Sequence, residues 1–520
     1  MSSTAAVPDS AEPLTANPVA PEHFDVLVVG AGLSGISAGW HLQTKCPAKT
    51  FAILEGRQAI GGTWDLFRYP GVRSDSDMHT LGFGFRPWRG ARAIADGPAI
   101  LRYVQDTARE YGIDRRVRFG HRVTRAAWSS VEARWTVDAS LADETTTRLT
   151  CNFLYACSGY YDYAEGHLPR WPGMERYRGR IVHPQHWPGD LDPAGQRIVV
   201  IGSGATAVTL VPALAATAAH VTMLQRSPTY VVSRPSEDAV ANWLHRWLPG
   251  RLADGAIRWK NVLLGLGFYA LAQHRPDATR RAIVRLARRQ LGPSHDVERH
   301  FTPRYDPWDQ RLCLAPDGDL FAALRSGSAA VVTDEIETFT EEGVRLKSGQ
   351  VLRADLVVTA TGLKLQLLGG MRLTVDGVPV DAGASISYKG VMYSDVPNFA
   401  AVFGYINASW TLKSDLAAGY VCRLINRMDA RGARWCVPRR GAAMGSEPAI
   451  RMSSGYFQRA SAILPRQGTK KPWRFHQNYL LDLLVLRFGA VDDAALEFGP
   501  GTRRAAPLRA HAGKPRGKSS

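Results

Sequence analysis

Two glycine-rich turns, each entered from a buried strand, constrain the fold of this chain more than any other feature. Residues 24–29 are expected to form a parallel strand that runs into residues 30–35 (GAGLSG), and helical periodicity follows to Leu42. A second strand, residues 50–54, ends at Glu55. In this pattern the glycines admit a pyrophosphate, the helix N-terminus faces its charge, and the acid holds a ribose hydroxyl. A chance glycine turn does not explain the strand, the helix and the acid together.

The second turn repeats the pattern with one informative change. A strand at residues 197–201 enters residues 202–207 (GSGATA), a helix follows to Ala216, and a strand at residues 221–224 leads to Arg226. Arg226 therefore stands where an acid would bind a bare ribose hydroxyl, and a cation there accommodates a 2′-phosphate. The sequence predicts NADP(H) as the second nucleotide. The alternative is a surface arginine without a ligand.

The loops after the first turn indicate a bulky, planar cofactor in the first site. Residues 61–66 (GGTWDL) and 68–75 (RYPGVRSD) bring glycines close to the first nucleotide turn. Such loops suit a buried flavin better than a second adenine, although an ordinary Pro-Gly turn is the simpler alternative. Between the two turns lie residues 177–188 (YRGRIVHPQHWP), a segment placed to contact both nucleotides. We predict that this segment couples the two sites.

These signals predict an α/β fold with two Rossmann-like dinucleotide-binding domains and a helical insertion. A chain of 520 residues has room for at least two cores. The flavin-binding domain is expected to be discontinuous, from residues 23–162 and 355–495, because a buried strand at 355–361 would return the chain to it. The NADP-binding domain takes residues 163–354, with the insertion at about 238–300 and a β-meander near 329–334, 344–347 and 351–352. Residues 1–22 and the basic residues 496–520 are expected to be disordered.

Composition limits the classes of protein to which this chain can belong. The net charge of +17 comes without any nucleic-acid motif, and six cysteines without a CxxC pair are typical of a reduced, cytoplasmic protein. The leader lacks the pattern of a signal peptide, and the longest apolar run, residues 262–272, is too short to span a bilayer. Residues 278–291 carry five arginines around an apolar stripe. Such a helix can rest on an anionic membrane or present a solvated face.

The segment between the turns resembles a known fingerprint. Tyr177-x-Gly179-x-x-x-His183-x-x-x-Trp187-Pro188 is similar to FxGxxxHxxxW(P/D), which marks Baeyer–Villiger enzymes among the class B flavoprotein monooxygenases. Tyr177 replaces the usual Phe and keeps the aromatic ring. The resemblance covers roughly residues 22–495. It implies that Tyr177, Gly179, His183, Trp187 and Pro188 couple domain movement to the flavin cycle, with His183 neither acid nor base.

The resemblance also assigns cofactor contacts to individual residues. FAD would have Ser34 and Glu55 at its adenosine half, the loop from Thr63 to Leu66 near its isoalloxazine, and the backbone of Val123 at its adenine. NADPH would lie across residues 202–208, with Arg226 and Ser227 at its 2′-phosphate. The complete set of predicted cofactor-binding residues is Gly30, Gly32, Ser34, Gly35, Glu55, Thr63, Trp64, Asp65, Leu66, Arg73, Ser74, Asp75, Val123, Gly202, Ser203, Gly204, Ala205, Thr206, Ala207, Val208, Arg226 and Ser227.

Asp75 and Arg311 match the family's catalytic pair. The implied reaction reduces FAD with NADPH, adds oxygen at C4a of the flavin, and inserts one oxygen atom into a ketone to give an ester or lactone. Soft sulfur in thioamides or thioethers would also be oxygenated. Arg311 would stabilise the peroxyanion, and Asp75 would hold Arg311 in place. Gln310 stands where the family often has a lysine that meets the 2′-phosphate, which leaves Arg226 carrying more of the NADPH preference.

Other classes remain as alternatives to be tested. A strict N- or S-oxygenase and an NADPH oxidase share the same cofactors, and a membrane-surface protein would use the arginine helix and the tail. A metal site is not expected: His183 and His186 lack a third ligand at suitable spacing, and a proline lies between them. A hydrolase is not expected either, because no GxSxG turn follows a strand.

Overall fold

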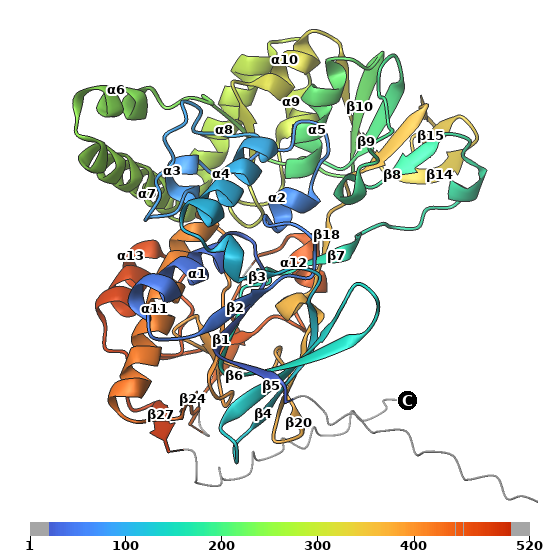
Figure 1. The fold of residues 1–520 in the computed structure, drawn as a ribbon. Coiled ribbons are helices and arrows are strands. Elements are labelled where there is room, and N and C mark those ends of the chain that lie inside the picture. The colour runs from blue at the N-terminus through green and yellow to red at the C-terminus, as the bar shows by residue number, and fades with distance from the viewer. Residues whose placement is uncertain (1–19, 442–443, 451, 501–520) are drawn as a thin grey trace, which may run out of the picture.

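The computed structural model describes residues 20–441, 444–450 and 452–500, and it has two lobes (Figure 1). The first lobe is built on a nine-stranded sheet in the order β20-β19-β4-β5-β6-β1-β2-β3, with β23 paired to β6. Its strands come from both halves of the chain: β1 (Glu22–Val29), β2 (Phe51–Leu54), β3 (Val117–Arg118), β4 (Arg122–Ser129), β5 (Arg134–Ser140), β6 (Thr146–Ala156), β19 (Arg372–Val375), β20 (Val378–Pro379) and β23 (Phe399–Ala401).

The strands β1, β2 and β6 run parallel, and the last residues of each are buried, because both faces of the sheet pack against a core. Three helices pack around one core beside this sheet: α1 (Leu33–Lys45), α4 (Gly97–Glu110) and α11 (Trp410–Ala430). Gly30, between β1 and α1, has a φ of +102°, and a Cβ there would lie 2.8 Å from the carbonyl oxygen of Cys157. The turn therefore needs glycine to pass close to β6.

The second lobe is built on a five-stranded parallel sheet in the order β13-β10-β9-β17-β8. The strands are β8 (Arg180–Val182), β9 (Arg197–Ile201), β10 (His220–Gln225), β13 (Ala329–Thr333) and β17 (Leu356–Thr359). Helix α5 (Ala205–Ala215) follows the second glycine turn and packs on this sheet. The predicted α/β fold with two Rossmann-like units is therefore confirmed.

Two predicted strand assignments in this lobe were wrong. Residues 329–333 do not belong to the meander but form the edge strand β13; the meander consists of β14 (Ile336–Thr340), β15 (Gly343–Leu346) and β16 (Val351–Arg353). The strand β17, expected to return to the first lobe, lies between β9 and β8. The boundary predicted at residue 355 therefore falls after Thr359. A fully buried apolar strand fits either parallel sheet, so its pattern does not identify its sheet.

The predicted disordered tail also begins too early. The strand β27 (Leu496–Gly499) pairs with β24 (Trp435–Pro438), and Leu496 is buried. The guanidinium of Arg431 lies 4.7 Å from the ring centroid of Phe498. Two apolar anchors thus hold a segment whose basic composition further along suggested disorder. Residues 501–520 and 1–19 lie outside the described residues.

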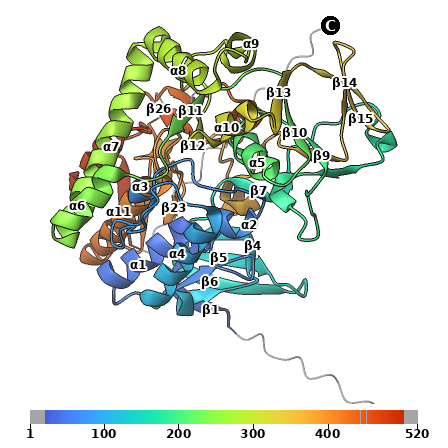
Figure 2. The same ribbon diagram turned by 90° about the horizontal axis from the view of Figure 1, so that it is seen from above.

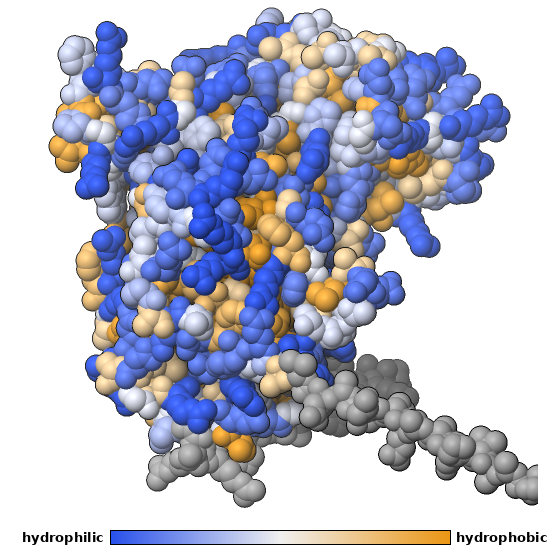
Figure 3. Space-filling model, in the orientation of Figure 1, coloured by the Kyte–Doolittle hydropathy of each residue, from blue (hydrophilic) through white to orange (hydrophobic). Residues whose placement is uncertain are grey.

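The helical insertion runs along one side of the molecule (Figure 2). It consists of α6 (Ala239–Trp247), α7 (Gly250–His274), α8 (Pro276–Leu291) and α9 (Val297–Phe301), as the sequence predicted. Hydrophilic side chains cover much of the visible surface, and apolar ones show mainly in the middle of this view, between the lobes, with a few at the edge where α6 and α7 lie (Figure 3). Two strands, β11 (Val231–Arg234) and β12 (Cys313–Pro316), and helix α10 (Asp319–Arg325) join the insertion to the second lobe.

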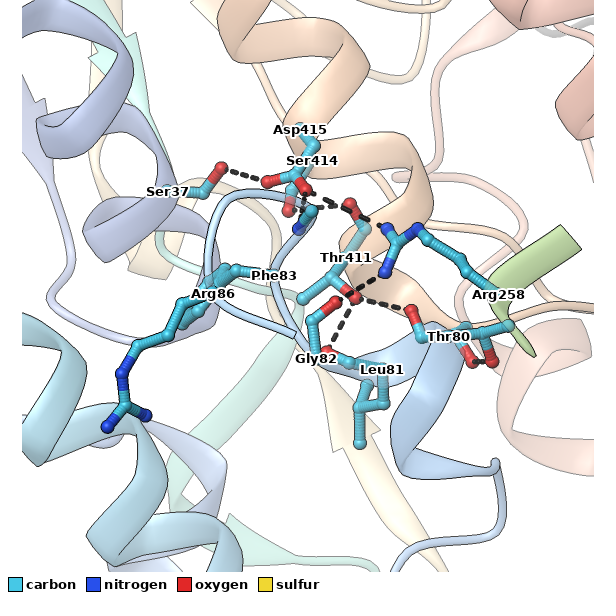
Figure 4. A network of polar contacts seen from close by, with 12 residues as sticks. Ser37, Thr80, Leu81, Gly82, Phe83, Arg86, Arg258, Thr411, Ser414 and Asp415 are labelled. Carbon is cyan, nitrogen blue, oxygen red and sulfur yellow. Dashed lines mark hydrogen bonds and ion pairs between the residues drawn. The ribbon is translucent and has the colours of Figure 1, made fainter. Parts of the chain in front are cut away.

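One arginine of the insertion holds α7 against the first lobe (Figure 4). Arg258 donates hydrogen bonds to the carbonyl oxygens of Gly82, at 2.8 Å, and His79, at 3.2 Å. Asp415 on α11 lies 3.8 Å from the same guanidinium and accepts from Ser37 and from the backbone N–H of Gly84. Because α1, α7 and α11 all contribute to this network, the insertion is fixed relative to the first nucleotide turn.

Two extended linkers cross between the lobes. They are β7 (Tyr161–Gly166) and β18 (Leu363–Leu365), which pair antiparallel to one another. The remaining elements are α2 (Thr63–Leu66), α3 (Met78–Leu81), α12 (Gly455–Arg459), α13 (Tyr479–Asp482), the π-helical η5 (Leu483–Phe488), β21 (Ser387–Tyr388), β22 (Met392–Tyr393), β25 (Ser446–Pro448), β26 (Arg466–Gly468) and the short 3₁₀ turns η1 (Asp114–Arg116), η2 (Met174–Arg176), η3 (Pro184–His186) and η4 (Leu367–Gly370).

Candidate active site

A cavity of about 560 Å³ extends from the first nucleotide turn to the second lobe. Residues from both nucleotide turns, from both linkers and from the loop before α11 line it. The predicted site residues among its walls are Gly30, Gly32, Ser34, Glu55, Thr63, Trp64, Arg73, Ser74, Asp75, Val123, Ala205, Thr206 and Arg311. One continuous space is thus bordered by both predicted nucleotide sites and by the predicted catalytic pair.

The first turn presents an acid and an open backbone to this cavity. The carboxylate of Glu55 accepts hydrogen bonds from the N–H groups of Ala31, at 2.7 Å, and Arg57, at 2.9 Å. Burial raises the pKa of Glu55, although both N–H groups oppose that shift. A Cβ on Gly32 would meet only Gly62, at 3.6 Å, so the backbone stays accessible to a ligand. Gly35 does not line the cavity: its Cβ would lie 1.8 Å from the oxygen of Gly30, which makes it a packing glycine.

The short helix α2 divides the loop residues between cavity and interior. Thr63 and Trp64 line the cavity, whereas Asp65 and Leu66, predicted with them, do not. Asp65 is buried and forms ion pairs with Arg57, at 2.5 Å, and Arg68, at 2.7 Å. Since Arg57 does line the cavity, Asp65 acts on the site through Arg57.

Asp75 and Arg311 meet as predicted, although 236 positions separate them. An Nη of Arg311 donates to a carboxylate oxygen of Asp75 at 2.6 Å, and both side chains line the cavity. Burial is the largest effect on Arg311 and disfavours its charge, but Asp75 together with Tyr456, Tyr160 and Tyr161 outweighs burial and holds the pKa of Arg311 well above its usual value. The Nε of Arg311 is buried without a hydrogen-bond partner in the described residues. A permanent cation with a spare donor therefore stands at this wall.

Aromatic residues that the sequence analysis did not assign surround this cation. Tyr160, Tyr161 and Tyr456 lie close enough to Arg311 to affect its charge. Burial raises the pKa of Tyr456 to about 12, so its phenol is neutral at pH 7. Trp410, at the start of α11, donates from its indole N–H to Ser34 at 2.7 Å. The sequence did carry a sign of these residues: the run YYDY at residues 160–163 begins four residues after the end of β6, at the edge of the sheet where ligands bind.

The second turn lies at the far end of the cavity. Gly202 has a φ of +134°, and a Cβ there would lie 2.3 Å from the oxygen of Ala360, whereas Gly204 has open space around it. Ala205 and Thr206 line the cavity, but Gly202, Ser203, Gly204, Ala207, Val208, Arg226 and Ser227 do not. Ala207 and Val208 are core residues. Ser203 donates to the carbonyl oxygen of Ser227 at 3.2 Å, which ties the exposed Arg226 segment to the turn.

The fingerprint segment contacts both linkers. His183 donates from Nε2 to the carbonyl oxygen of Gly362, at 3.2 Å, just before β18. A Cβ on Gly166, at the end of β7, would lie 2.0 Å from the His183 ring. Burial lowers the pKa of His183, so the ring is neutral at pH 7. Tyr177 donates to the oxygen of Ala354 at 3.0 Å, and Gly179 leaves room for the Tyr177 ring. Trp187 packs against the second-lobe core.

The described part of the chain lacks two other kinds of feature. It contains no group of three or more His, Cys, Asp or Glu side chains arranged to hold a metal ion. It also contains no helix that is both long and apolar enough to cross a membrane.

Two dinucleotide-type turns around one cavity, with an Asp–Arg pair at its wall, define a flavoprotein of the two-nucleotide monooxygenase class. Residues 28–96 match the family model described as "NAD(P)-binding Rossmann-like domain", and residues 95–244 match "Flavin-binding monooxygenase-like". The chain is 55% identical over 489 residues, 94% of its length and 99% of the relative's, to "FAD-containing monooxygenase EthA" of Mycobacterium tuberculosis. It belongs to this family of FAD-containing monooxygenases, as the fingerprint predicted.

The chain is also similar to other FAD-containing monooxygenases and to solved structures of monooxygenases. The chain is 53% identical to EthA of Mycolicibacterium smegmatis, over 92% of this chain and 97% of that one. It is 47% identical to "Probable FAD-binding monooxygenase AlmA" of Acinetobacter baylyi, with the same coverage. A steroid monooxygenase bound to NADP has a TM-score of 0.73 at 21% identity, and cyclohexanone monooxygenase has 0.71 at 18%; each match covers 92% of this chain and 100% of the other. These two structures share the fold of this chain.

Proposed function

We propose that this enzyme uses NADPH and O₂ to insert one oxygen atom into ketones, and that it also oxygenates the sulfur of thioamides or thioethers. The balanced reaction is ketone, O₂, NADPH and H⁺ to ester or lactone, NADP⁺ and water. The Arg311–Asp75 pair at the wall of the shared cavity is the observation that carries this proposal. Arg311 is a fixed cation in a partly dehydrated site, where a charge acts more strongly than in water.

The two nucleotides would occupy opposite ends of the cavity. FAD fits the first end: Gly32 leaves the backbone open, Glu55 offers a carboxylate for a ribose hydroxyl, and Val123 is at the wall. NADPH fits the second end, where the N-terminus of α5 lines the cavity and the exposed Arg226 lies outside it; both favour phosphate groups. When bound, FAD supplies the redox chemistry, accepting hydride from NADPH and activating oxygen.

The protein's own contribution is to position charge and to exclude water. Arg311 would stabilise negative charge that develops on the reacting oxygen atoms, and its guanidinium keeps a fixed orientation because Asp75 binds it at 2.6 Å. The neutral phenols of Tyr161 and Tyr456 add hydrogen-bonding groups beside this charge without competing for it. Asp75 acts through Arg311 and is a positioning residue.

A substrate panel tests this function. The purified enzyme, with NADPH and O₂, should convert simple aliphatic ketones to esters and thioethers to sulfoxides, with NADPH consumption and product recorded together. If the products include sulfoxide but no ester, the enzyme is a strict S- or N-oxygenase and the proposed ketone oxidation is wrong. Peroxide equal to the NADPH consumed, without either product, would leave an NADPH oxidase.

His183 is proposed to couple the two nucleotide sites through the linkers. His183→Ala should lower the yield of oxygenated product per NADPH several-fold, about threefold to tenfold, because β7 and β18 lose their shared contact while the nucleotide sites stay intact. Gly166→Ala should have the same effect, since its Cβ would displace the imidazole. Product yield and the KM for NADPH are the measurements.

A double-variant cycle separates coupling from general damage. In the His183→Ala background the space around residue 166 is free, so Gly166→Ala should add little further loss. Fully additive losses, or a parallel rise in the KM for NADPH, would contradict the coupling role.

A further inference from the structure

The outer face of the helical insertion exposes an unusually apolar surface. We define the α6–α7 face by its exposed apolar side chains on α6, on α7, on the turn between them and on the neighbouring segment 481–488. Trp243, Trp247, Leu264 and Phe488 are each exposed by 59–67%. The other members are Val240, Leu248, Leu252, Trp259, Leu263, Phe268, Leu271, Leu481 and Leu484. Trp259 on α7 contacts Tyr479 on α13, with ring centroids 6.0 Å apart, so the patch is continuous from the insertion to the C-terminal segment.

Packing within the protein does not explain this composition. The inner side of α7 already has its own apolar contacts: Ala253, Ile257 and Val262 are buried against α6, α11 and the loop before α11. A helix that faced water with its other side would carry charged residues there. Instead the outer side of α7 carries leucines and aromatic rings along its whole length. Large contiguous apolar patches on a protein surface mark an interaction site.

The charges around the patch indicate the kind of partner. The acidic residues of α6, α7, α13 and η5 are Asp254 and Asp482. Their side chains are only 7% and 1% exposed, and each is paired internally, Asp254 with Arg89 and Asp482 with Lys413. Arg246, Arg251 and Arg487 are exposed and form no ion pair with the described residues. The face is therefore apolar with a mostly cationic rim, in which Glu237, just before α6, is an exposed acid.

This charge pattern favours a lipid surface over a second copy of the chain. In a two-fold dimer the same patch meets itself, which would bring unpaired arginines together with too few carboxylates to neutralise them. An anionic bilayer offers both complements at once, an apolar interior for tryptophan and leucine side chains and phosphate groups for the arginines. Tryptophan is also the side chain that prefers the membrane–water boundary.

The arginine helix predicted for lipid contact does not share these features. On α8 the apolar side chains Ile283, Val284, Ala287 and Leu291 are buried in the second-lobe region, and Leu286 is the exposed exception. Arg280 pairs with Asp306, and Arg288 pairs with Glu298. The helix is an ordinary amphipathic helix with a solvated polar face, which corrects the lipid-facing alternative at this position.

We propose that the α6–α7 face docks the enzyme onto an anionic bilayer surface, with the tryptophans and leucines inserted at the headgroup boundary and the arginines on lipid phosphates. The inner side of α7 borders the active site: Val262 packs against Tyr405, which lines the cavity, and Tyr269 contacts Trp308, three residues before Arg311. Docking would therefore bring the cavity wall close to apolar molecules dissolved in the bilayer.

Co-sedimentation of the full-length, FAD-loaded protein with vesicles tests the proposal. The protein should bind vesicles of equimolar phosphatidylcholine and phosphatidylglycerol, and high salt should weaken the binding. The triple variant Trp243→Ser, Trp247→Ser, Leu264→Ser should lower the partition coefficient at least about tenfold, through lost apolar burial. Arg246→Gln with Arg251→Gln should lower it about fivefold per charge, and only with the anionic vesicles.

Two controls make the result specific. Val131→Ser with Val378→Ser removes exposed apolar side chains from the first lobe and should leave vesicle binding unchanged. Replacing the six basic residues of the tail (503, 504, 509, 514, 516 and 518) by glutamine in the full-length chain should also preserve most of the binding. Thermal unfolding and flavin content should match the parent protein in every variant, because the changed side chains are exposed.

Three outcomes would overturn the proposal. They are absence of vesicle binding, binding that the triple variant retains while the tail variant loses it, and a dimer in sedimentation velocity that the triple variant dissociates. The last result would make the face a contact between copies of the chain.

Discussion

Arg311→Ala is expected to abolish oxygen insertion while NADPH still reduces the flavin. The guanidinium lies against the cavity, 2.6 Å from Asp75, and its Nε has no other partner in the described residues. Removing one positioned donor that stabilises developing negative charge typically costs about 10²- to 10³-fold in rate. The nucleotide turns do not include Arg311, so hydride transfer should continue. Oxygen consumption should then end in peroxide.

Anaerobic flavin reduction and aerobic product formation, measured on the same preparation, separate these steps. Arg304→Ala is the matched control, because Arg304 is exposed and belongs to the same loop. Asp75→Asn should keep the cation but loosen its position, with a smaller loss than Arg311→Ala. If the alanine variant kept more than about a tenth of the product rate, or lost flavin reduction equally, Arg311 would not be the charge that oxygenation needs.

Local patterns were enough to predict the nucleotide turns. Gly30 and Gly202 both have positive φ values and pass within contact distance of a neighbouring strand, which the GxGxxG spacing alone implies. The positions of Glu55, at the end of β2, and of Arg226, after β10, could be predicted from the lengths of the strands that precede them. The resemblance to the family added the pairing of Asp75 with Arg311, which no spacing rule could supply across so much sequence.

The predictions that failed depend on contacts between segments that are distant in the sequence. The pattern of β17 shows that it is buried but not which sheet buries it, so the domain boundary was misplaced. The loop containing Asp65 was assigned to the cofactor as a unit, although one turn of helix directs Asp65 toward Arg57 instead. Tyr456 reaches Arg311 from a short helix near the C-terminus, and its sequence surroundings carry no signal of that contact.

Sequence periodicity predicted least well which side of each helix in the insertion is exposed to solvent. The apolar run at residues 262–272 predicted a helix and excluded a membrane span, but it did not reveal which side would remain exposed. The arginine-rich residues 278–291 attracted the lipid interpretation because charge is visible in a sequence. The structure instead leaves α7 uncovered, because α8 occupies the position against the second lobe where its own apolar residues are buried.

Arg226→Ala is expected to raise the KM for NADPH by roughly 10- to 100-fold and to leave the KM for NADH almost unchanged. A charge-assisted hydrogen bond to a phosphate is worth about 1.5–3 kcal/mol, and NADH lacks the 2′-phosphate that would make it. Arg226 is suited to the role because it is exposed after β10, because Ser203 ties its segment to the glycine turn, and because no carboxylate of the described residues pairs with it.

The control for this change is Arg345→Ala, which removes an exposed arginine from β15 and should alter neither constant. Gln310 sharpens the expectation: a lysine there would share the phosphate, and its absence leaves Arg226 as the main cation for it. Gln310→Lys in the Arg226→Ala background should therefore recover part of the NADPH preference. Equal losses with both coenzymes would assign Arg226 to the shape of the turn instead of to the phosphate, and the predicted NADPH specificity would then lack its physical basis.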